Sequence, residues 1–186
     1  MSVWFTSDHH FGHARVITLC SRPFASVDEM DAEMIRRWNA VVAPDDVVYH
    51  LGDFAFADHT PYLRALAGEK RLILGNHDHS RRLKVAEGWS SVDSLLHVTV
   101  DDADIVLCHY GMRVWRRSHH GVLHFYGHSH GNLPGDSQST DVGVDCWSFA
   151  PVSLGAIRQR LATLPRRVEP DHHAPRDRAG AAADRD

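Results

Sequence analysis

Short apolar runs alternate along this chain with stretches in which apolar residues recur every three or four positions. The short runs are often β-branched or aromatic and end in turn residues, and they predict strands over residues 2–7, 46–51, 70–74, 95–100, 104–108, 122–126 and 141–145. Helical spacing is clearest over residues 27–42, where Asp28 and Glu29 also suit a helix N-terminus. Further helices are expected over residues 16–20, 59–67, 81–87 and 153–164.

The order of these elements indicates the fold class. Helices alternate with strands in the first half of the chain, whereas strands follow one another in the second half, where residues 101–103 predict a hairpin turn. We therefore expect an α/β fold in which sheets pack face to face with helices outside, not a purely parallel doubly wound sheet. Residues 1–164 form the predicted domain, and residues 165–186, rich in Pro, Arg, Asp, His and Ala, predict a disordered tail.

The composition narrows the class of protein. Of the 186 residues, 43% are hydrophobic and 24% are charged, as in an ordinary globular domain. The formal net charge of −4 gives no support for a surface that binds long nucleic acid. The three cysteines are too few for a disulfide framework, no apolar run is long enough to span a membrane, and the N-terminus lacks a signal segment. We expect a cytoplasmic protein, and the sequence leaves its oligomeric state open.

Polar side chains suited to metal binding lie just beyond the predicted strands, where α/β folds usually build their sites. They are Asp8, His10, Asp53, Asn76, His77, His109, His128 and His130, in a chain that holds 16 histidines. A turn containing Asn, His and Asp is by itself typical of any turn, so residues 75–78 gain meaning only from the other groups. All donors are nitrogen or oxygen, which favours Mn, Fe, Zn, Co or Ni over a structural zinc site made of cysteines.

These candidates outnumber the ligands that one ion needs, and seven of them, with one shared carboxylate, would serve two ions. Two metals about 3.5–4 Å apart recur in phosphoester hydrolysis, because they lower the pKa of a bridging water and bind phosphoryl oxygens. A free imidazole close by can protonate the departing alkoxide.

Five sequence blocks occur in one order: Asp8-x-His10, Gly52-Asp53, Gly75-Asn76-His77-Asp78, His109 and Gly127-His128-x-His130. In this combination the chain resembles the calcineurin-like metallophosphoesterase superfamily. The chain further resembles a branch of small, single-domain bacterial and phage members, at residues 7–13, Arg22-Pro23-Phe24, Trp38-Asn39 and residues 50–54.

The resemblance implies a four-layer β-sandwich flanked by helices, two divalent ions with manganese favoured, and a role for each residue. The first metal would be held by Asp8, His10 and His130, and the second by Asn76, His109 and His128. Asp53 would bridge the two metals, and His77 would be the unliganded catalytic histidine.

One departure concerns the partner of His77. In the protein phosphatase branch, a further Asp after the Gly-Asp block pairs with the catalytic histidine. Here Gly52-Asp53 continues into residues 54–56, which hold no carboxylate, so the adjacent Asp78 becomes the candidate that orients His77.

The expected activity is hydrolysis of phosphoesters by a hydroxide that two metals activate, with Asn76 stabilising the negative oxygens and His77 protonating the leaving group. Nucleotide-type or other small diesters are favoured over monoesters, because the short chain carries no inserted cap domain to close over a small monoester. A phosphomonoesterase of the same fold is the alternative. From a different class, a weakly active protein-binding scaffold, such as the retromer subunit of this superfamily, is a further alternative. A metallo-β-lactamase type fits less well, because no Asp-His follows residues 128–130 at the needed offset.

Other polar residues near these blocks have more than one interpretation. His13 either contacts the substrate phosphate or caps a helix, and His9 and His50 are expected to play structural or supporting roles. A basic set between two ligand-bearing strands either lines the substrate cleft or forms a solvated loop; its members are Arg113, Arg116, Arg117, His119 and His120.

Overall fold

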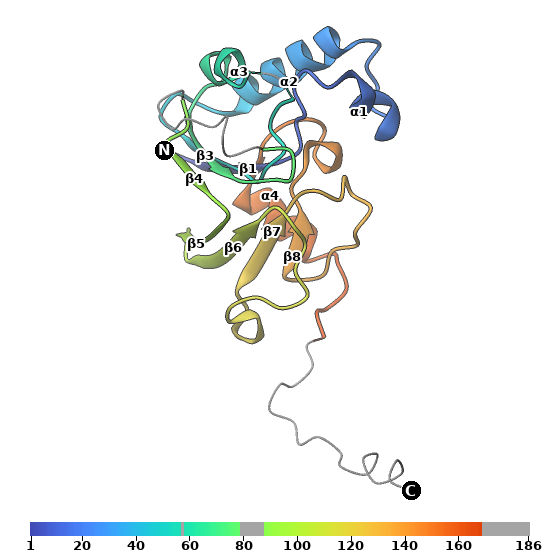
Figure 1. Ribbon diagram of the computed structural model, residues 1–186. Helices are drawn as coiled ribbons and strands as arrows, with labels where there is room; N and C mark the ends of the chain where they lie inside the picture. Colours follow the sequence, from blue (N-terminus) through green and yellow to red (C-terminus); the bar gives the residue numbers. More distant parts are fainter. Residues whose placement is uncertain (57, 79–87, 169–186) are drawn as a thin grey trace, which may run out of the picture.

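Two β-sheets stacked face to face form the centre of the computed structural model, and helices lie outside them (Figure 1). The structure describes residues 1–56, 58–78 and 88–168. The α/β sandwich predicted from the order of the elements is confirmed. The helix predicted over residues 81–87 and the tail from residue 169 onward lie outside the described residues.

The first sheet has the strand order β4-β3-β2-β1-β9. Its strands are β1 (Val3–Thr6), β2 (Val47–His50), β3 (Glu69–Ile73), β4 (Ser91–Asp93) and β9 (Val152–Ser153). Strands β1 to β4 pair in parallel, and β9 pairs antiparallel to β1. Parallel strands end at the same edge of a sheet, so the loops that follow β1, β2 and β3 meet there.

The second sheet has the order β5-β6-β7-β8. Its strands are β5 (Leu95–Val100), β6 (Ala103–Cys108), β7 (Leu123–Tyr126) and β8 (Ser139–Asp141). The predicted hairpin is confirmed, because β5 and β6 pair antiparallel from Leu95 opposite Cys108 to Val100 opposite Ala103. Strands β6, β7 and β8 are parallel, so β6 and β7 also deliver their following loops to one edge.

Side chains alternate between the two faces of each strand, which explains the short apolar runs. In β2, Tyr49 belongs to the core between the sheets, whereas Val48 belongs to the core beneath the helices. Phe5 of β1 and Phe125 of β7 meet edge to face across the sandwich, with ring centroids 5.0 Å apart. Burial of each such side chain stabilises the fold by about 1.5–3 kcal/mol.

Helices α1 (Ala14–Leu19), α2 (Val27–Val41) and α3 (Thr60–Ala65) lie on the outer side of the first sheet (Figure 1). The buried face of α2 consists of Met30, Met34 and Trp38, the spacing that the sequence predicts. The helix begins after Ser26, whose hydroxyl accepts a hydrogen bond from the Glu29 N–H at 3.1 Å.

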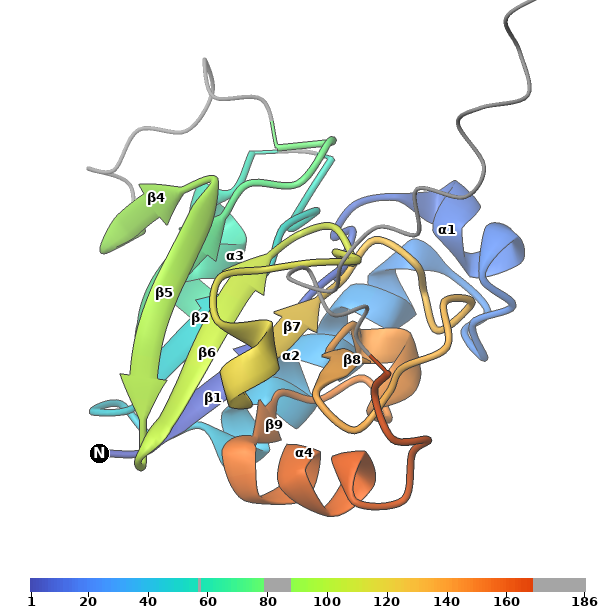
Figure 2. The same cartoon turned by 90° about the horizontal axis from the view of Figure 1, so that it is seen from below.

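The last helix, α4 (Leu154–Leu161), runs beside β9 and closes one side of the core between the sheets (Figure 2). Ser153 caps it, with its hydroxyl accepting from the Ala156 N–H at 3.3 Å. Outside the second sheet, Trp115 and Val122 pack on Val106 near a short 3₁₀ helix, η2 (Ser118–His120). Within the described ranges, no helix has the length and apolar character needed to cross a membrane.

The chain departs from the sequence prediction around β8. The strand predicted over residues 141–145 is wrong, because β8 ends at Asp141 and a 3₁₀ helix, η3 (Val144–Cys146), follows. The cause is the Asp141 carboxylate, which accepts a hydrogen bond from the Gly143 N–H at 2.6 Å and turns the chain. Strands β4 and β9 were not predicted, since three and two residues are too short to show a period.

The first residues of the predicted tail contact the domain. The Pro165 carbonyl accepts from the Ser137 N–H at 2.8 Å. The Arg167 guanidinium pairs with the Asp136 carboxylate at 2.9 Å and lies over the Trp115 ring, 4.0 Å from its centroid. Pro165 and Arg167, both within the predicted tail, therefore pack against the domain.

Candidate metal centre

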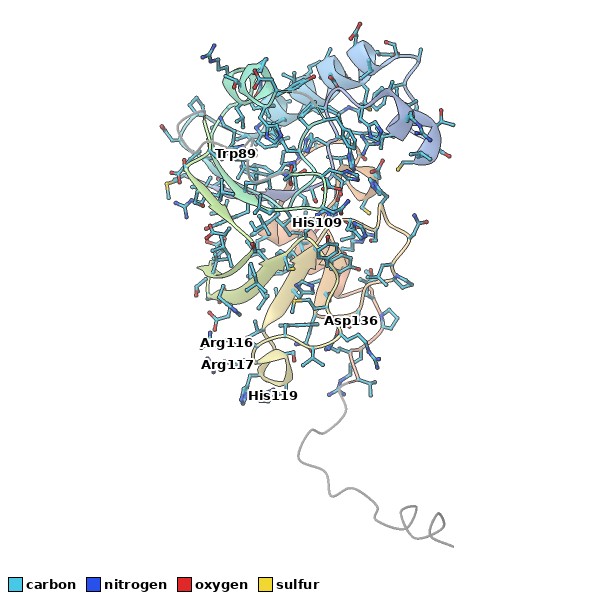
Figure 3. All side chains as sticks on the ribbon, viewed as in Figure 1. Trp89, His109, Arg116, Arg117, His119 and Asp136 are labelled. Carbon is cyan, nitrogen blue, oxygen red and sulfur yellow. The ribbon has the colours of Figure 1, made fainter. Side chains whose placement is uncertain are left out.

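Six of the seven predicted ligands converge in two clusters where the loops after the parallel strands meet. In each cluster the potential ligand atoms all lie within 4.8 Å of one another. The first cluster contains Asp8, His10 and His130, and the second contains Asp53, His109 and His128. His109, the residue after β6, lies near the middle of the molecule, at the junction of the two sheets (Figure 3).

The Asp53 carboxylate faces both clusters. Its Oδ2 lies 3.7 Å from His10 Nε2 and 3.6 Å from His109 Nε2. Its Oδ1 accepts a hydrogen bond from the His77 N–H at 2.8 Å, which holds the carboxylate in this orientation. One oxygen thus points between two imidazoles from different clusters, as a bridging ligand would.

The seventh predicted ligand, Asn76, joins the second cluster through its amide. Its Oδ1 lies 3.0 Å from His109 Nε2, so the amide oxygen and the ring nitrogen face the same space. The other ring nitrogen, His109 Nδ1, lies 2.7 Å from the Leu51 carbonyl oxygen. A carbonyl can only accept, so Nδ1 carries the proton and Nε2 presents its lone pair to the cluster.

Left-handed backbone is concentrated at this site. Five of the seven predicted ligands have φ between +47° and +66°: Asp8, His10, Asp53, His128 and His130. Residues other than glycine rarely adopt this region, and each instance costs roughly 1–3 kcal/mol. The turns that follow the strands thus hold these residues in backbone conformations that the surrounding structure must enforce.

Glycines beside the ligands allow the loops to approach one another. A Cβ at Gly75 would collide with the Asp53 carboxylate, and one at Gly127 would collide with the Asp8 carboxylate. At Gly52, where φ is +98°, a Cβ would lie 2.6 Å from His109 Nδ1. The glycines of the sequence blocks are therefore required by steric contact with the predicted ligands.

The first cluster contains buried polar atoms that lack hydrogen-bond partners among the described residues. They are Asp8 Oδ1 and both ring nitrogens of His10, with Asp8 Oδ1 3.9 Å from His10 Nε2. Burial raises the pKa of Asp8 to about 8, and burial, together with the charge of His130, lowers the pKa of His10 to about 2. Unpartnered buried groups are costly, and a divalent cation would satisfy the carboxylate and the imidazole together. The residues present therefore fit a metal ion.

Two residues outside the predicted ligand set hold His130 in place. The Asp145 carboxylate accepts from His130 Nδ1–H at 2.7 Å, which directs Nε2 toward Asp8 and His10. Arg22, 4% exposed, donates to both oxygens of Asp145 at 2.8 and 2.9 Å and also to the carbonyl oxygen of Asp8 at 2.6 Å.

These charged contacts shift two pKa values. Although burial opposes it, the hydrogen bond to Asp145 and the charge of Asp8 raise the pKa of His130. Burial likewise opposes ionisation of Asp145, but hydrogen bonds from His130 and Arg22 lower its pKa to about 2. Arg22 lies in a sequence block that carries the family resemblance, whereas nothing in the sequence singles out Asp145.

His77 lies at the open side of the site. Its Nε2 is 4.0 Å from Asp53 Oδ2, and its side chain is 43% exposed. Asp78, the predicted orienting partner, is engaged elsewhere: its carboxylate accepts from the backbone N–H groups of Asp53, Phe54 and Gly75 at 2.6, 3.0 and 2.9 Å. In the described part of the chain, no hydrogen bond joins Asp78 to the His77 ring. Asp78 fixes the loop after β3 against the loop after β2.

The other histidines near the clusters occupy different surroundings. His13 precedes α1 without a side-chain capping bond, and its ring stacks on Phe56 with centroids 3.8 Å apart. His9 and His50 are fully buried and share a hydrogen bond of 2.9 Å between Nδ1 and Nε2. Their structural role agrees with the expectation from sequence.

The basic set of residues 113–120 does not line the metal centre. Arg116, Arg117 and His119 lie at the far end of the molecule from His109, around η2 (Figure 3). Of the two interpretations of this set, a substrate cleft or a solvated loop, the position of these three residues favours the loop. Residues 118–120 form η2, and the chain reaches the ligand-bearing edge again only after β7 has crossed the second sheet.

The comparisons with known proteins decide the family. The model of the calcineurin-like phosphoesterase superfamily domain matches residues 1–163. The chain belongs to this superfamily. The family predicted from the sequence blocks is thereby confirmed, and membership supports a metal-dependent phosphoesterase, a hydrolase that acts on phosphoesters.

Relatives of this phosphoesterase include archaeal and phage proteins. An uncharacterized protein of Methanocaldococcus jannaschii is 33% identical over 168 residues, which covers 83% of this chain and 88% of the relative. The Gene 66 protein of Mycobacterium phage D29 is 30% identical over 180 residues, covering 78% and 89% of the two chains. Among solved structures, a protein of unknown function from Aquifex aeolicus has a TM-score of 0.66 at 23% identity, over 85% of this chain and 98% of the other.

Proposed function

We propose that this phosphoesterase is a two-metal phosphodiesterase that hydrolyses small, nucleotide-type diesters. The observation that carries the proposal is the position of Asp53 Oδ2, 3.7 Å from His10 in one cluster and 3.6 Å from His109 in the other. A carboxylate oxygen shared between two histidine-rich clusters suits two divalent ions. Manganese is the favoured metal, with Fe, Zn, Co or Ni as alternatives, because all the donors are nitrogen or oxygen.

The seven side chains divide between two ions in this proposal. The first would be held by Asp8, His10 and His130, and the second by Asn76, His109 and His128, with Asp53 between them. When bound, the ions supply positive charge for phosphoryl oxygens and lower the pKa of a bound water.

Protein groups supply the remaining chemistry. The Asn76 side chain, whose Oδ1 faces His109, makes no hydrogen bond through its amide N–H groups to the described residues, and these groups are proposed to donate to a phosphoryl oxygen. His77 is proposed to protonate the leaving-group oxygen, because its ring lies beside the clusters and its backbone is tied to Asp53 Oδ1. Asp78 acts as a positioning residue that keeps these two loops together.

The preference for diesters rests on the openness of the site. In the described residues no separate domain covers His77, whose side chain is 43% exposed, so a substrate with groups on both sides of phosphorus can enter. A monoester would leave one side of the site without contacts. A cytoplasmic location is also proposed, in keeping with three free cysteines at positions 20, 108 and 146.

The test begins with metal content. Metal-free protein is reconstituted with Mn²⁺, the bound ions are counted by elemental analysis, and turnover of bis(p-nitrophenyl) phosphate is compared with that of p-nitrophenyl phosphate. We expect two ions per chain and a higher kcat/KM for the diester. Asp53→Asn should lose metal at both clusters, whereas His97→Ala, on the exposed face of β5, should match the wild type.

Each other outcome points to a different function. A higher kcat/KM for the monoester would replace the diesterase with a phosphomonoesterase. Full metal occupancy with no turnover of either ester would favour the protein-binding scaffold. One ion per chain would refute the two-metal mechanism.

A further inference from the structure

Two large aromatic side chains stand exposed beside the metal centre. Phe56 is 39% exposed and Tyr110 is 48% exposed, although apolar rings of this size are normally buried. Both belong to loops that also carry predicted ligands, since Phe56 follows Asp53 and Tyr110 follows His109. At this position their exposed surface is available to a substrate that reaches the clusters.

Phe56 lies on the side of the first cluster and the proposed proton donor. Its ring centroid is 4.7 Å from that of His77 and 5.6 Å from that of His10. One face stacks on His13, and the Phe56 N–H donates to the Phe11 carbonyl at 2.9 Å, which fixes the backbone. The ring is therefore held in place while more than a third of the residue remains open to solvent.

Tyr110 lies on the side of the second cluster. Its ring centroid is 5.0 Å from that of His109 and 4.9 Å from that of His128, in both cases edge to face. Two residues further on, the Met112 N–H donates to the buried His124 Nε2 at 3.1 Å and anchors this loop. The two aromatic rings thus flank opposite ends of the pair of clusters.

We propose that Phe56 and Tyr110 are stacking platforms for the two ester groups of a linear, nucleoside-bearing phosphodiester. This inference rests on the proposed phosphodiesterase function and adds the substrate class. With phosphorus at the clusters, the group that leaves next to His77 extends over Phe56. The group that stays on phosphorus extends over Tyr110, and a nucleobase there gains a planar contact.

The magnitude of stacking makes the proposal measurable. Stacking of a base on an aromatic side chain contributes about 1–3 kcal/mol, equivalent to a change of about fivefold to about 150-fold in affinity. A ring that only sealed the histidines from water would affect every substrate equally, because it would act through the metal site. A stacking platform affects only substrates that carry a planar group on its own side.

The experiment compares two chromogenic diesters with the same leaving group. Thymidine 5′-(p-nitrophenyl) phosphate carries a nucleoside on the retained side, and methyl p-nitrophenyl phosphate carries only a methyl group. Tyr110→Ala should lower kcat/KM at least fivefold more for the thymidine ester than for the methyl ester, and Tyr110→Phe should restore the wild-type ratio. Phe56→Ala should lower kcat/KM for both esters, because both have an aromatic leaving group, and Phe56→Tyr should restore it. A ring that only seals the histidines would give the same result, so for Phe56 the binding measurement below decides between the two roles.

A binding measurement gives a second readout. Calorimetric titration of the Mn²⁺-loaded protein with thymidine 5′-monophosphate, the retained product, should show weaker binding to Tyr110→Ala and unchanged binding to Phe56→Ala. Metal content should stay at the wild-type level in both variants. Leu95→Ala, which removes an exposed apolar side chain from β5, is the matched control and should change nothing.

The outcomes separate this inference from the function on which it rests. If the wild type hydrolyses both esters and Tyr110→Ala affects them equally or not at all, the stacking assignment is overturned and the phosphodiesterase stands. If the metal-loaded wild type hydrolyses neither ester, the proposed function fails and the inference fails with it.

Discussion

Asp145 should control metal affinity at the first cluster without touching the metal. Its carboxylate holds His130 Nδ1–H at 2.7 Å and is itself held by Arg22 on both oxygens. Asp145→Asn leaves one acceptor oxygen, for which His130 and Arg22 then compete. The imidazole loses its fixed orientation and part of its basicity, and we expect weaker metal binding.

The size of the effect follows from the role of such partners. Loss of a group that orients a metal-bound histidine typically lowers metal affinity about 10- to 100-fold. At a fixed metal concentration this removes about 1.4–2.7 kcal/mol of metal-dependent stabilisation. For a domain of this size, that corresponds to a metal-induced rise in Tm smaller by about 3–10 °C.

The assay is thermal unfolding of each variant in chelator and in excess Mn²⁺. Breaking the buried pair with Arg22 lowers the metal-free Tm as well, so the informative quantity is the difference between the two conditions. Asp136→Asn is the control, because it removes a comparable pair with Arg167 (2.9 Å) far from the clusters and should leave the metal-induced rise intact. An unchanged rise in Asp145→Asn would refute the orienting role.

Three further predictions concern catalysis and folding. His77→Ala should lower kcat about 10²- to 10⁴-fold with metal content unchanged, since the ring approaches Asp53 no closer than 4.0 Å. Gly75→Ala should reduce both metal content and Tm, because its Cβ would collide with the Asp53 carboxylate. Gly155→Ala in α4 should instead raise the free energy of unfolding by about 0.5–1 kcal/mol, because its Cβ would meet only the Ser153 hydroxyl, at an ordinary contact distance of 3.9 Å. Hydrogen bonds from two backbone N–H groups lower the pKa of Asp46 to about 2 from its ordinary 3.8. Asp46→Asn should therefore unfold at a lower urea concentration than the wild type at neutral pH. The difference between the two urea midpoints should close as the pH falls from about 4 to 2.

Each of these has an opposing result. Metal loss in His77→Ala would make that residue a ligand instead of a proton donor. Equal Tm values for Gly75→Ala and the wild type would mean that the loop yields without disturbing Asp53. A gap for Asp46→Asn that persists unchanged at pH 2 would mean that the charge of Asp46 contributes nothing.

The ligand-bearing parts of the fold were the most predictable from sequence. Asp8, Asp53 and His109 each follow an apolar run, and the carboxyl ends of neighbouring parallel strands meet at one edge whatever the loops contain. The pattern of strand followed by polar turn was therefore enough to predict that these side chains gather. The glycines that precede several ligands carried further information, because only they permit the close approach of the loops.

Contacts set by side-chain direction were not predictable. Asp78 follows His77 directly, yet its carboxylate accepts a hydrogen bond from the backbone of Asp53, 25 residues earlier. That two residues are adjacent in sequence does not determine which side-chain rotamer each adopts. Asp145 lies in a segment whose residue pattern predicts a strand. Its contact with His130 depends on the 3₁₀ helix that the chain forms there instead. The position of residues 113–120 at the far end depends on how the chain crosses the second sheet, which has no local signal.

The left-handed backbone at five predicted ligands also determines which substitutions selection for stability alone would favour. Glycine would adopt each of these conformations without the penalty that a side chain carries. His128 combines the largest φ of the five, +66°, with an exposed side chain. A library of variants selected only for resistance to heat would accumulate glycine at position 128, and these variants would bind metal more weakly as their Tm rose. Only a screen that also demands turnover would keep the histidine.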